Sequence, residues 1–109
     1  MIATATIDTV MQVLAVPTRR AVFERIVQSG EITVVELTRG SGVTQGAISQ
    51  HLKSLKQAGL VAERAQGRNV YYRARPEGLE PLADWMGHYG AFWRDRFADL
   101  RALLEEIDP

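Results

Sequence analysis

The chain has 109 residues, no cysteine, 46% hydrophobic residues and a formal net charge of zero. These values predict one globular domain over residues 1–109 and exclude disulfides, thiolate metal sites and thiol redox switches. No apolar run approaches the ~18 residues needed to span a bilayer, and the N-terminus lacks the positive charge of a secretory signal. We therefore expect a cytoplasmic protein with no membrane partner.

The zero net charge conceals two oppositely charged parts. Residues 1–75 hold ten Arg and Lys against five Asp and Glu, whereas residues 76–109 hold three against eight. Within the basic part, residues 44–75 place six basic residues against the single acid Glu63. A basic body with an acidic C-terminal part favours contact between the body and a polyanion.

Two helices are predicted before the most basic segment. The first has Thr6 or Asp8 near its start, and the second begins at Pro17, because proline is tolerated at the first helical position. Gly30 is expected to end the second helix. The apolar side of the first helix is formed by Ile7, Val10, Met11 and Leu14, and that of the second by Ala21, Val22, Ile26 and Phe23.

A helix-turn-helix is predicted over about residues 33–58. Thr33 and Glu36 form a capping box at the start of a short third helix, which ends at Gly40. Thr44 suits the N-cap of the fourth helix and Gly59 its C-terminal stop. Two helices joined by a short glycine-containing turn are typical of this motif. The apolar side of the third helix is expected to consist of Val34, Val35 and Leu37.

The fourth helix has one apolar face and one polar face. At 100° per residue, Ile48, Leu52 and Leu55 share the face that must be buried. The opposite face suits DNA, because Gln pairs with adenine, Ser meets several base edges, and Lys reaches guanine or phosphate. His51 lies beside the buried stripe, so we expect a partly buried side chain and no metal or base contact. The DNA-binding residues predicted here are Thr44, Gln45, Gly46, Ser49, Gln50, Lys53 and Lys56.

A basic hairpin, or wing, is predicted over about residues 60–75, with strands at 60–65 and 70–75. Gly67 and Asn69 tolerate the positive φ of a tight turn. Tyr71 and Tyr72 should point to opposite faces. Arginine at a ribbon tip suits phosphate binding or entry into a narrow minor groove. The predicted DNA-binding residues of the wing are therefore Arg64, Arg68 and Arg73.

One long helix is predicted over about residues 79–106, with apolar residues on more than one side. Such a helix can pack on its own domain and on a second copy related by two-fold symmetry. Alternatively, Trp85, Phe92 and Trp93 line a pocket for a small apolar effector. The expected dimer interface consists of Met11, Leu82, Met86, Tyr89, Trp93, Leu100 and Leu104. The predicted fold class is mainly α with a small β-hairpin, in the order α-α-α-α-β-β-α, with the first and last helices at the dimer interface.

Several of these segments together resemble the ArsR/SmtB family of small dimeric winged-helix repressors. The likeness rests on Pro17-Thr18-Arg19-Arg20, Val43-Thr44-Gln45-Gly46-Ala47-Ile48-Ser49-Gln50-His51-Leu52, Leu55, Ala58-Gly59-Leu60-Val61, Arg64, Gly67-Arg68 and Tyr71-Tyr72-Arg73. It implies that the fourth helix is the recognition helix and the hairpin the wing. Many family members sense metals through a Cys-x-Cys pair, but here the corresponding stretch is Leu37-Thr38-Arg39-Gly40.

Metal sensing is therefore not expected. A second family site uses carboxylate and His ligands on the last helix, where this chain has Asp84 and His88 at the i, i+4 spacing and Asp95 and Asp99 further along, but lacks the family's second His. Because zinc requires more converging ligands, Asp84 and His88 are interpreted as a surface pair, and no metal or other cofactor is predicted. The signal is left open between a small organic molecule, another protein and the protein's own concentration.

The function predicted from these features is sequence-specific binding of double-stranded DNA by a homodimeric repressor at a near-palindromic operator. The alternative is a winged-helix module for protein–protein contact, in which the wing docks an acidic partner. An enzyme is not expected, because the chain has no phosphate-cradling loop and no His–carboxylate cluster suited to acid–base chemistry.

Overall fold

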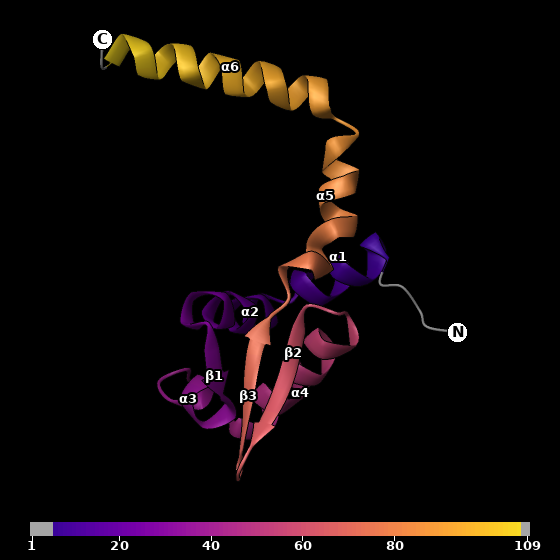
Figure 1. Ribbon diagram of the computed structural model, residues 1–109, viewed down its shortest axis with the longest axis vertical. Coiled ribbons are helices and arrows are strands. Elements are labelled where there is room, and N and C mark those ends of the chain that lie inside the picture. The colour runs from indigo at the N-terminus through magenta and orange to yellow at the C-terminus, as the bar shows by residue number, and fades with distance from the viewer. Residues whose placement is uncertain (1–5, 108–109) are drawn as a thin grey trace.

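A computed structural model of the chain describes residues 6–107, so the outermost residues of the predicted domain lie outside the described part. It has the mainly helical architecture with a small antiparallel sheet that was expected (Figure 1). The elements are α1 (Ile7–Ala15), α2 (Pro17–Ser29), β1 (Glu31–Thr33), α3 (Val34–Thr38), α4 (Gln45–Gln57), β2 (Val61–Gln66), β3 (Asn69–Ala74), the 3-10 helix η1 (Pro76–Leu79), α5 (Glu80–Gly87) and α6 (Gly90–Ile107).

Helix starts follow the predicted capping chemistry. Thr6, Thr33 and Thr44 are the N-caps of α1, α3 and α4, and each Oγ1 accepts a hydrogen bond from a backbone N–H three residues later. The Thr33 hydroxyl also donates to Glu36 Oε1 at 2.9 Å, which confirms that these two side chains interact. Pro17 begins α2, and Gly30 caps its C-terminus with φ +81°.

The core lies between α2, α3, α4 and the sheet. Ile26, Leu55 and Leu60 are fully buried, and α1 adds Val10 while packing on α2 and α5. Two expectations are wrong: Ala21 and Val35 are exposed, because their helices turn those positions towards solvent. The other buried core residues are Val22, Phe23, Ile32, Leu37, Ile48, Leu52, Ala58 and Val61.

The sheet has three strands rather than two, in the order β1-β3-β2, all antiparallel. β1 pairs Glu31 with Arg73 and Thr33 with Tyr71, so the hairpin is joined to the segment that precedes α3. The wing strands lie within one residue of their predicted limits. Gly67 has φ +62° and no non-glycine residue described has positive φ. The tip is therefore a type II′ turn, and the positive φ expected of Asn69 is wrong because Asn69 is paired with Gln66.

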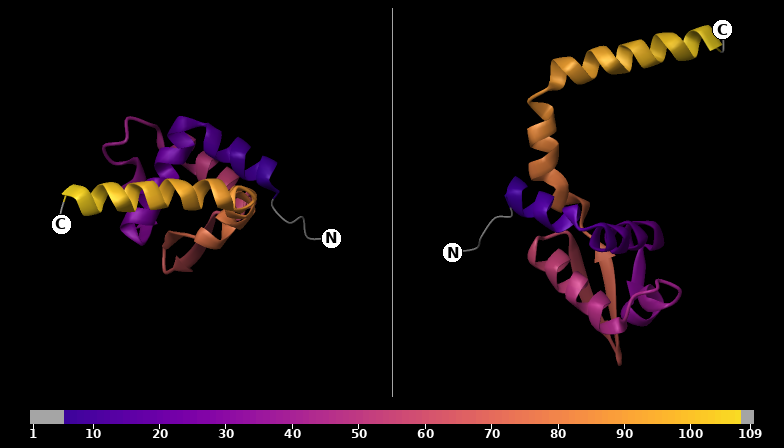
Figure 2. Two further views of the ribbon diagram at one scale, coloured as in Figure 1. Left: turned by 90° about the horizontal axis from the view of Figure 1, so that it is seen from above. Right: turned by 180° about the vertical axis from the view of Figure 1, so that it is seen from behind.

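The single long C-terminal helix expected over 79–106 is wrong. The chain forms η1, α5 and α6, with a break at His88 and Tyr89 between Gly87 and Gly90. Glycine is about 1 kcal/mol worse than alanine in a helix, which favours a break here. Beyond it, α6 projects from the body (Figures 1 and 2). The radius of gyration is accordingly 17.6 Å, against about 13 Å for a compact domain of this length. No helix among residues 6–107 is long and apolar enough to cross a membrane.

Gly78 places the C-terminal helices directly against the end of α4. A Cβ at this position would lie 2.3 Å from the Gly59 carbonyl oxygen. We expect Gly78→Ala to lower the free energy of unfolding by about 1–3 kcal/mol, because backbone has to move. Gly87→Ala is the matched control, since its Cβ would meet nothing within 4 Å. Urea denaturation of both variants measures the difference, and equal stabilities would contradict the close backbone approach.

Candidate nucleic-acid interface

The packing of α4 leaves one face of the helix open to solvent. Ile48, Leu52 and Leu55 are at most 1% exposed and fix the rotation of the helix on the body. Every predicted DNA-binding residue of the helix start and α4 is exposed. A Cβ on Gly46 would meet nothing within 4 Å, so the backbone here is open to close approach. The exposed set is Thr44, Gln45, Gly46, Ser49, Gln50, Lys53 and Lys56.

Arg68 lies in the turn of the hairpin, between the paired residues Gln66 and Asn69, and is exposed. This tip is at the end of the body farthest from α6 (Figure 1). Within residues 6–107, Arg68 makes no ion pair. The tip therefore offers an uncompensated positive charge on the part of the molecule that extends farthest from the C-terminal helix.

The charge of Lys56 is partnered by Glu63, which joins the end of α4 to β2. The hydrogen bond from Lys56 holds the pKa of Glu63 below its usual value, and Tyr72 adds to this effect. Burial and the contact with Glu63 raise the pKa of Tyr72. Tyr72 packs against the core, whereas Tyr71 does not, which agrees with their expected opposite faces. The ion pair between Lys56 and Glu63 therefore joins α4 to the wing on the inner face of the sheet, where Tyr72 also lies.

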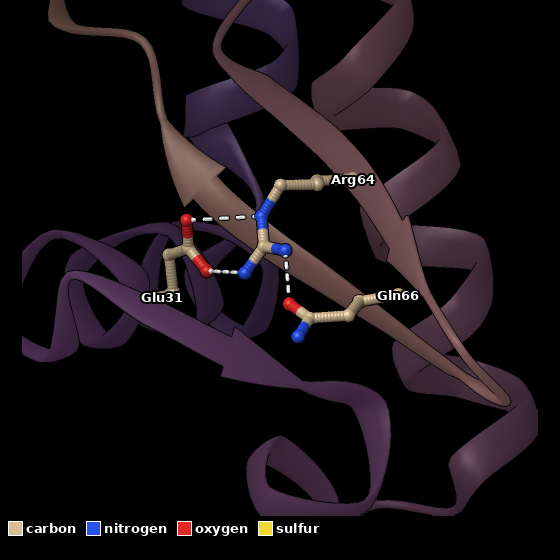
Figure 3. Close-up of polar contacts among 3 residues, drawn as sticks. All are labelled: Glu31, Arg64 and Gln66. Atoms are coloured by element: carbon tan, nitrogen blue, oxygen red, sulfur yellow. Dashed lines mark hydrogen bonds and ion pairs between the residues drawn. The ribbon is translucent and has the colours of Figure 1, made fainter.

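On the outer face, Arg64 reaches across β3 to Glu31 of β1 (Figure 3). Its Nη2 donates to Glu31 Oε2 at 2.6 Å and its Nε to Glu31 Oε1 at 3.4 Å. Nη1 donates to Gln66, and the guanidinium carbon lies 4.9 Å from the centre of the Tyr71 ring. The hydrogen bond from Arg64 lowers the pKa of Glu31. The positive charge of Arg73, in register with Glu31, contributes to the same shift.

The structure therefore separates the predicted arginines of the wing into two groups. Arg68 is at the tip, whereas Arg64 and Arg73 lie on the sheet beside Glu31. Arg25 was missed by the sequence reasoning: its Nη1 donates to the Leu37 carbonyl at 3.0 Å and to the Arg39 carbonyl at 3.4 Å. It thereby holds the end of α3 and the start of the helix-turn-helix connection. No local pattern marks this role, since the acceptors are 12 and 14 positions away.

His51 is half-buried, as expected, and its Nδ1 is enclosed by protein. Burial is the larger cause of its lowered pKa, and the nearby charge of Arg19 acts in the same direction. Both effects favour the neutral imidazole, which supports the helix from beside its buried face. Among residues 6–107, no three potential metal ligands converge, and Asp84 and His88 are both exposed.

The predicted dimer surface is largely uncovered within one chain. Every residue from Ala91 to Ile107 is exposed, whereas Leu82 is half-buried. The other predicted interface residues, which are Met11, Met86, Tyr89, Trp93, Leu100 and Leu104, are 36–55% exposed.

At the break between α5 and α6, aromatic side chains line an open apolar hollow of about 300 Å³. Trp85 packs edge-to-face on Tyr89, and Phe92 packs edge-to-face on Trp93, with ring centres 5.5 and 5.3 Å apart. Met86 completes the lining. Both uses considered for these aromatics, a dimer contact and an effector pocket, are compatible with this arrangement.

Known proteins share both the sequence and the fold. A family model described as a helix-turn-helix domain matches residues 14–64. The HTH-type transcriptional regulator Rv2034 of Mycobacterium tuberculosis is 45% identical over 75 residues, which cover 69% of each chain. The arsenic resistance transcriptional regulator ArsR1 of Pseudomonas putida is 41% identical over 68 residues. These residues are 62% of this chain and about half (53%) of that relative.

A solved structure extends the likeness to the fold. The homodimeric winged helix-turn-helix DNA-binding domain of Mb0332 from Mycobacterium bovis, described as a possible ArsR-family regulator, superposes with a TM-score of 0.62. The match covers 76% of this chain and 79% of that one, at 26% identity. Together with the exposed polar face of α4 and the basic wing, these relationships place the chain in the ArsR/SmtB family of winged helix-turn-helix proteins, which are DNA-binding transcriptional regulators and not enzymes.

Proposed function

We propose that the protein is a homodimeric transcriptional repressor that binds a near-palindromic operator. The observation that carries this proposal is the solvent-facing row of Gln45, Ser49 and Gln50 on α4, on a body whose wing tip carries Arg68, which has no ion-pair partner in the described part of the chain. In a two-fold dimer, two such helices enter successive major grooves about 34 Å apart. Repression is inferred from relatives that are named as repressors.

The exposed residues of α4 and the wing have different proposed roles. Gln45, Ser49 and Gln50 contact base edges, because their amide and hydroxyl groups can donate and accept in the major groove. Lys53 and Arg68 neutralise phosphates, which supplies affinity independent of sequence. Thr44 caps α4, and Gly46 allows close approach of the backbone to DNA. The remaining predicted contacts, Lys56, Arg64 and Arg73, contribute positive potential that Glu63 and Glu31 reduce.

The dimer is proposed to form through α6 together with α1 and α5. An apolar helix that projects from the body exposes hydrophobic side chains to water, which is unfavourable unless another surface covers them. A second copy of the chain is the simplest such surface. The homodimeric relative supports this arrangement. As a regulator that binds an operator, the protein is proposed to act in the cytoplasm. A small apolar effector at the α5–α6 hollow would act by changing this dimer.

The test is fluorescence-anisotropy binding to the DNA upstream of the protein's own coding region, compared with a random duplex across a salt series. Tighter binding to the upstream DNA, with a steep salt slope and two protomers per site, would support the operator-binding dimer. Weak and equal binding to both duplexes would contradict an operator at this position. Absence of binding at low salt would favour the protein–protein module instead.

Two substitutions separate base reading from phosphate binding. We expect Gln50→Ala to weaken operator binding by about 1–3 kcal/mol and to leave random DNA unaffected, because it removes a base contact. Arg68→Ala is expected to weaken binding to both duplexes and to reduce the magnitude of the salt slope by about one. Equal losses on both duplexes for both variants would contradict this division.

A further inference from the structure

We propose that Arg64 is a positioning residue, which fixes the direction of the wing through its ion pair with Glu31 and does not bind phosphate. This inference rests on the proposed function, because it concerns how the wing tip is placed for DNA. It reassigns a residue whose charge and location in the wing otherwise suggest direct contact with the duplex.

The guanidinium of Arg64 is already occupied by protein groups. Each of its three nitrogens donates to a side-chain oxygen, two to Glu31 and one to Gln66. The Tyr71 ring covers one of its faces at 4.9 Å. Three of the five N–H donors of Arg64 are used by these side-chain oxygens, so a phosphate can take a two-point contact with the Nε–Nη2 edge only by displacing the Glu31 carboxylate, which already holds that edge. Arg68, without an ion pair among the described residues, is the better phosphate ligand.

The position of the pair in the sheet explains what it controls. β1 lies beside β3 only at Arg73, Tyr72 and Tyr71, so beyond these residues the wing is a two-stranded ribbon. Such a ribbon is marginally stable and free to twist. Arg64 spans the central strand from β2 to β1, and its bond to Gln66 continues towards the tip. Arg64 stands opposite Tyr71, the last residue of β3 that β1 covers, so among residues 6–107 this pair is the side-chain link between β2 and β1 that lies nearest the two-stranded ribbon.

Glu31 is a firm anchor for this link. It directly follows Gly30, the residue that ends α2, and its backbone is paired with Arg73. α2 in turn is fixed in the core by Val22, Phe23 and Ile26. The link thus transmits the orientation of the helical body to the ribbon that carries Arg68.

The direction in which Glu31→Gln changes operator affinity distinguishes a positioning role of Arg64 from direct contact with phosphate. Removing an acid near DNA normally raises affinity, because the acid repels phosphates. If Arg64 bound phosphate, Glu31→Gln would free it and strengthen binding. If the pair positions the wing, Glu31→Gln weakens operator binding despite the gain in positive charge. The expected loss is about two- to five-fold, the range for an exposed ion pair.

The experiment measures operator affinity for Glu31→Gln, Arg68→Ala and the double variant, with Glu24→Gln as the control. Glu24 is an exposed acid of α2 that makes no ion pair within residues 6–107, so its loss changes charge alone. We expect weaker binding for Glu31→Gln, no weakening for Glu24→Gln, and no further effect of Glu31→Gln once Arg68 is absent. Unchanged or tighter binding by Glu31→Gln, or a loss that persists without Arg68, overturns the inference.

Amide hydrogen exchange of the free protein provides a readout that does not depend on DNA. Exchange at residues 65–70 should be faster in Glu31→Gln than in the wild type and unchanged in Glu24→Gln. Unchanged exchange in Glu31→Gln also overturns the inference. Failure of the wild type to bind any duplex would instead count against the proposed function, while the exchange comparison still decides whether the pair holds the ribbon.

Discussion

Leu100→Asp is expected to separate the dimer into monomers and to lower operator affinity by about two to three orders of magnitude. Leu100 is 50% exposed on α6, in the same helical face as Trp93, Phe97 and Leu104. A carboxylate in the centre of this face would be buried without a partner on dimerisation, which is strongly unfavourable. Once monomeric, the protein loses the high effective concentration of the second half-site contact, which accounts for the size of the effect.

Sedimentation equilibrium and anisotropy measure the two consequences separately. Ala102→Asp adds the same charge to α6 on the side opposite Leu100, where the residue is also exposed, and should change neither property appreciably. A dimeric Leu100→Asp protein with normal affinity would show that α6 does not form the interface. Loss of the dimer in both variants would point to helix destabilisation rather than to one interacting face.

Leu55→Ala is expected to lower the free energy of unfolding by about 2–5 kcal/mol. Leu55 is fully buried in the cluster that joins α4 to α2, α3 and the sheet, so truncation removes apolar contacts and leaves a cavity. This loss is a large part of the stability of a domain of this size. Urea denaturation measures it directly.

Lys53→Ala is the complementary control, because Lys53 is exposed on the opposite side of the same helix. Its stability should stay within about 0.5 kcal/mol of the wild type, while its DNA affinity falls. A cost below about 1 kcal/mol for Leu55→Ala would mean that α4 is not held as the structure describes. The pair of variants thus distinguishes the two faces of the recognition helix by two different measurements.

Features set by local chemistry were predicted well from the sequence. The N-caps Thr6, Thr33 and Thr44 bond to amides three residues away, so a short window contains all the relevant atoms. The turn at Gly67 and the buried stripe of α4 are likewise local patterns. The exposure of the α4 surface follows from that stripe alone, because burying one face of a helix leaves the opposite face in solvent.

Features that depend on distant residues were not predicted. β1 has three residues, and its partner strand lies far along the chain. Arg64 and Glu31 are 33 positions apart, so no sequence pattern indicates that the charge of this wing arginine is already partnered. The break after α5 escaped prediction because the apolar periodicity continues across Gly87 and Gly90, while their low helix propensity decides the local backbone. Contacts across the fold determine the β1 pairing and the Arg64–Glu31 pair, whereas the break is a local glycine effect that the apolar periodicity masked.

Pairing of β1 with β3 limits how DNA specificity can be exchanged between relatives. Residues 31–33 precede the helix-turn-helix in sequence, yet they belong to the same sheet as the wing. A chimera that transplants only the recognition helix and hairpin would join a foreign ribbon to the host's edge strand, with mismatched side chains on both faces. Exchange of residues 31–75 as one block keeps the edge strand, the recognition helix and the ribbon matched, and is the smallest unit that we expect to transfer specificity intact.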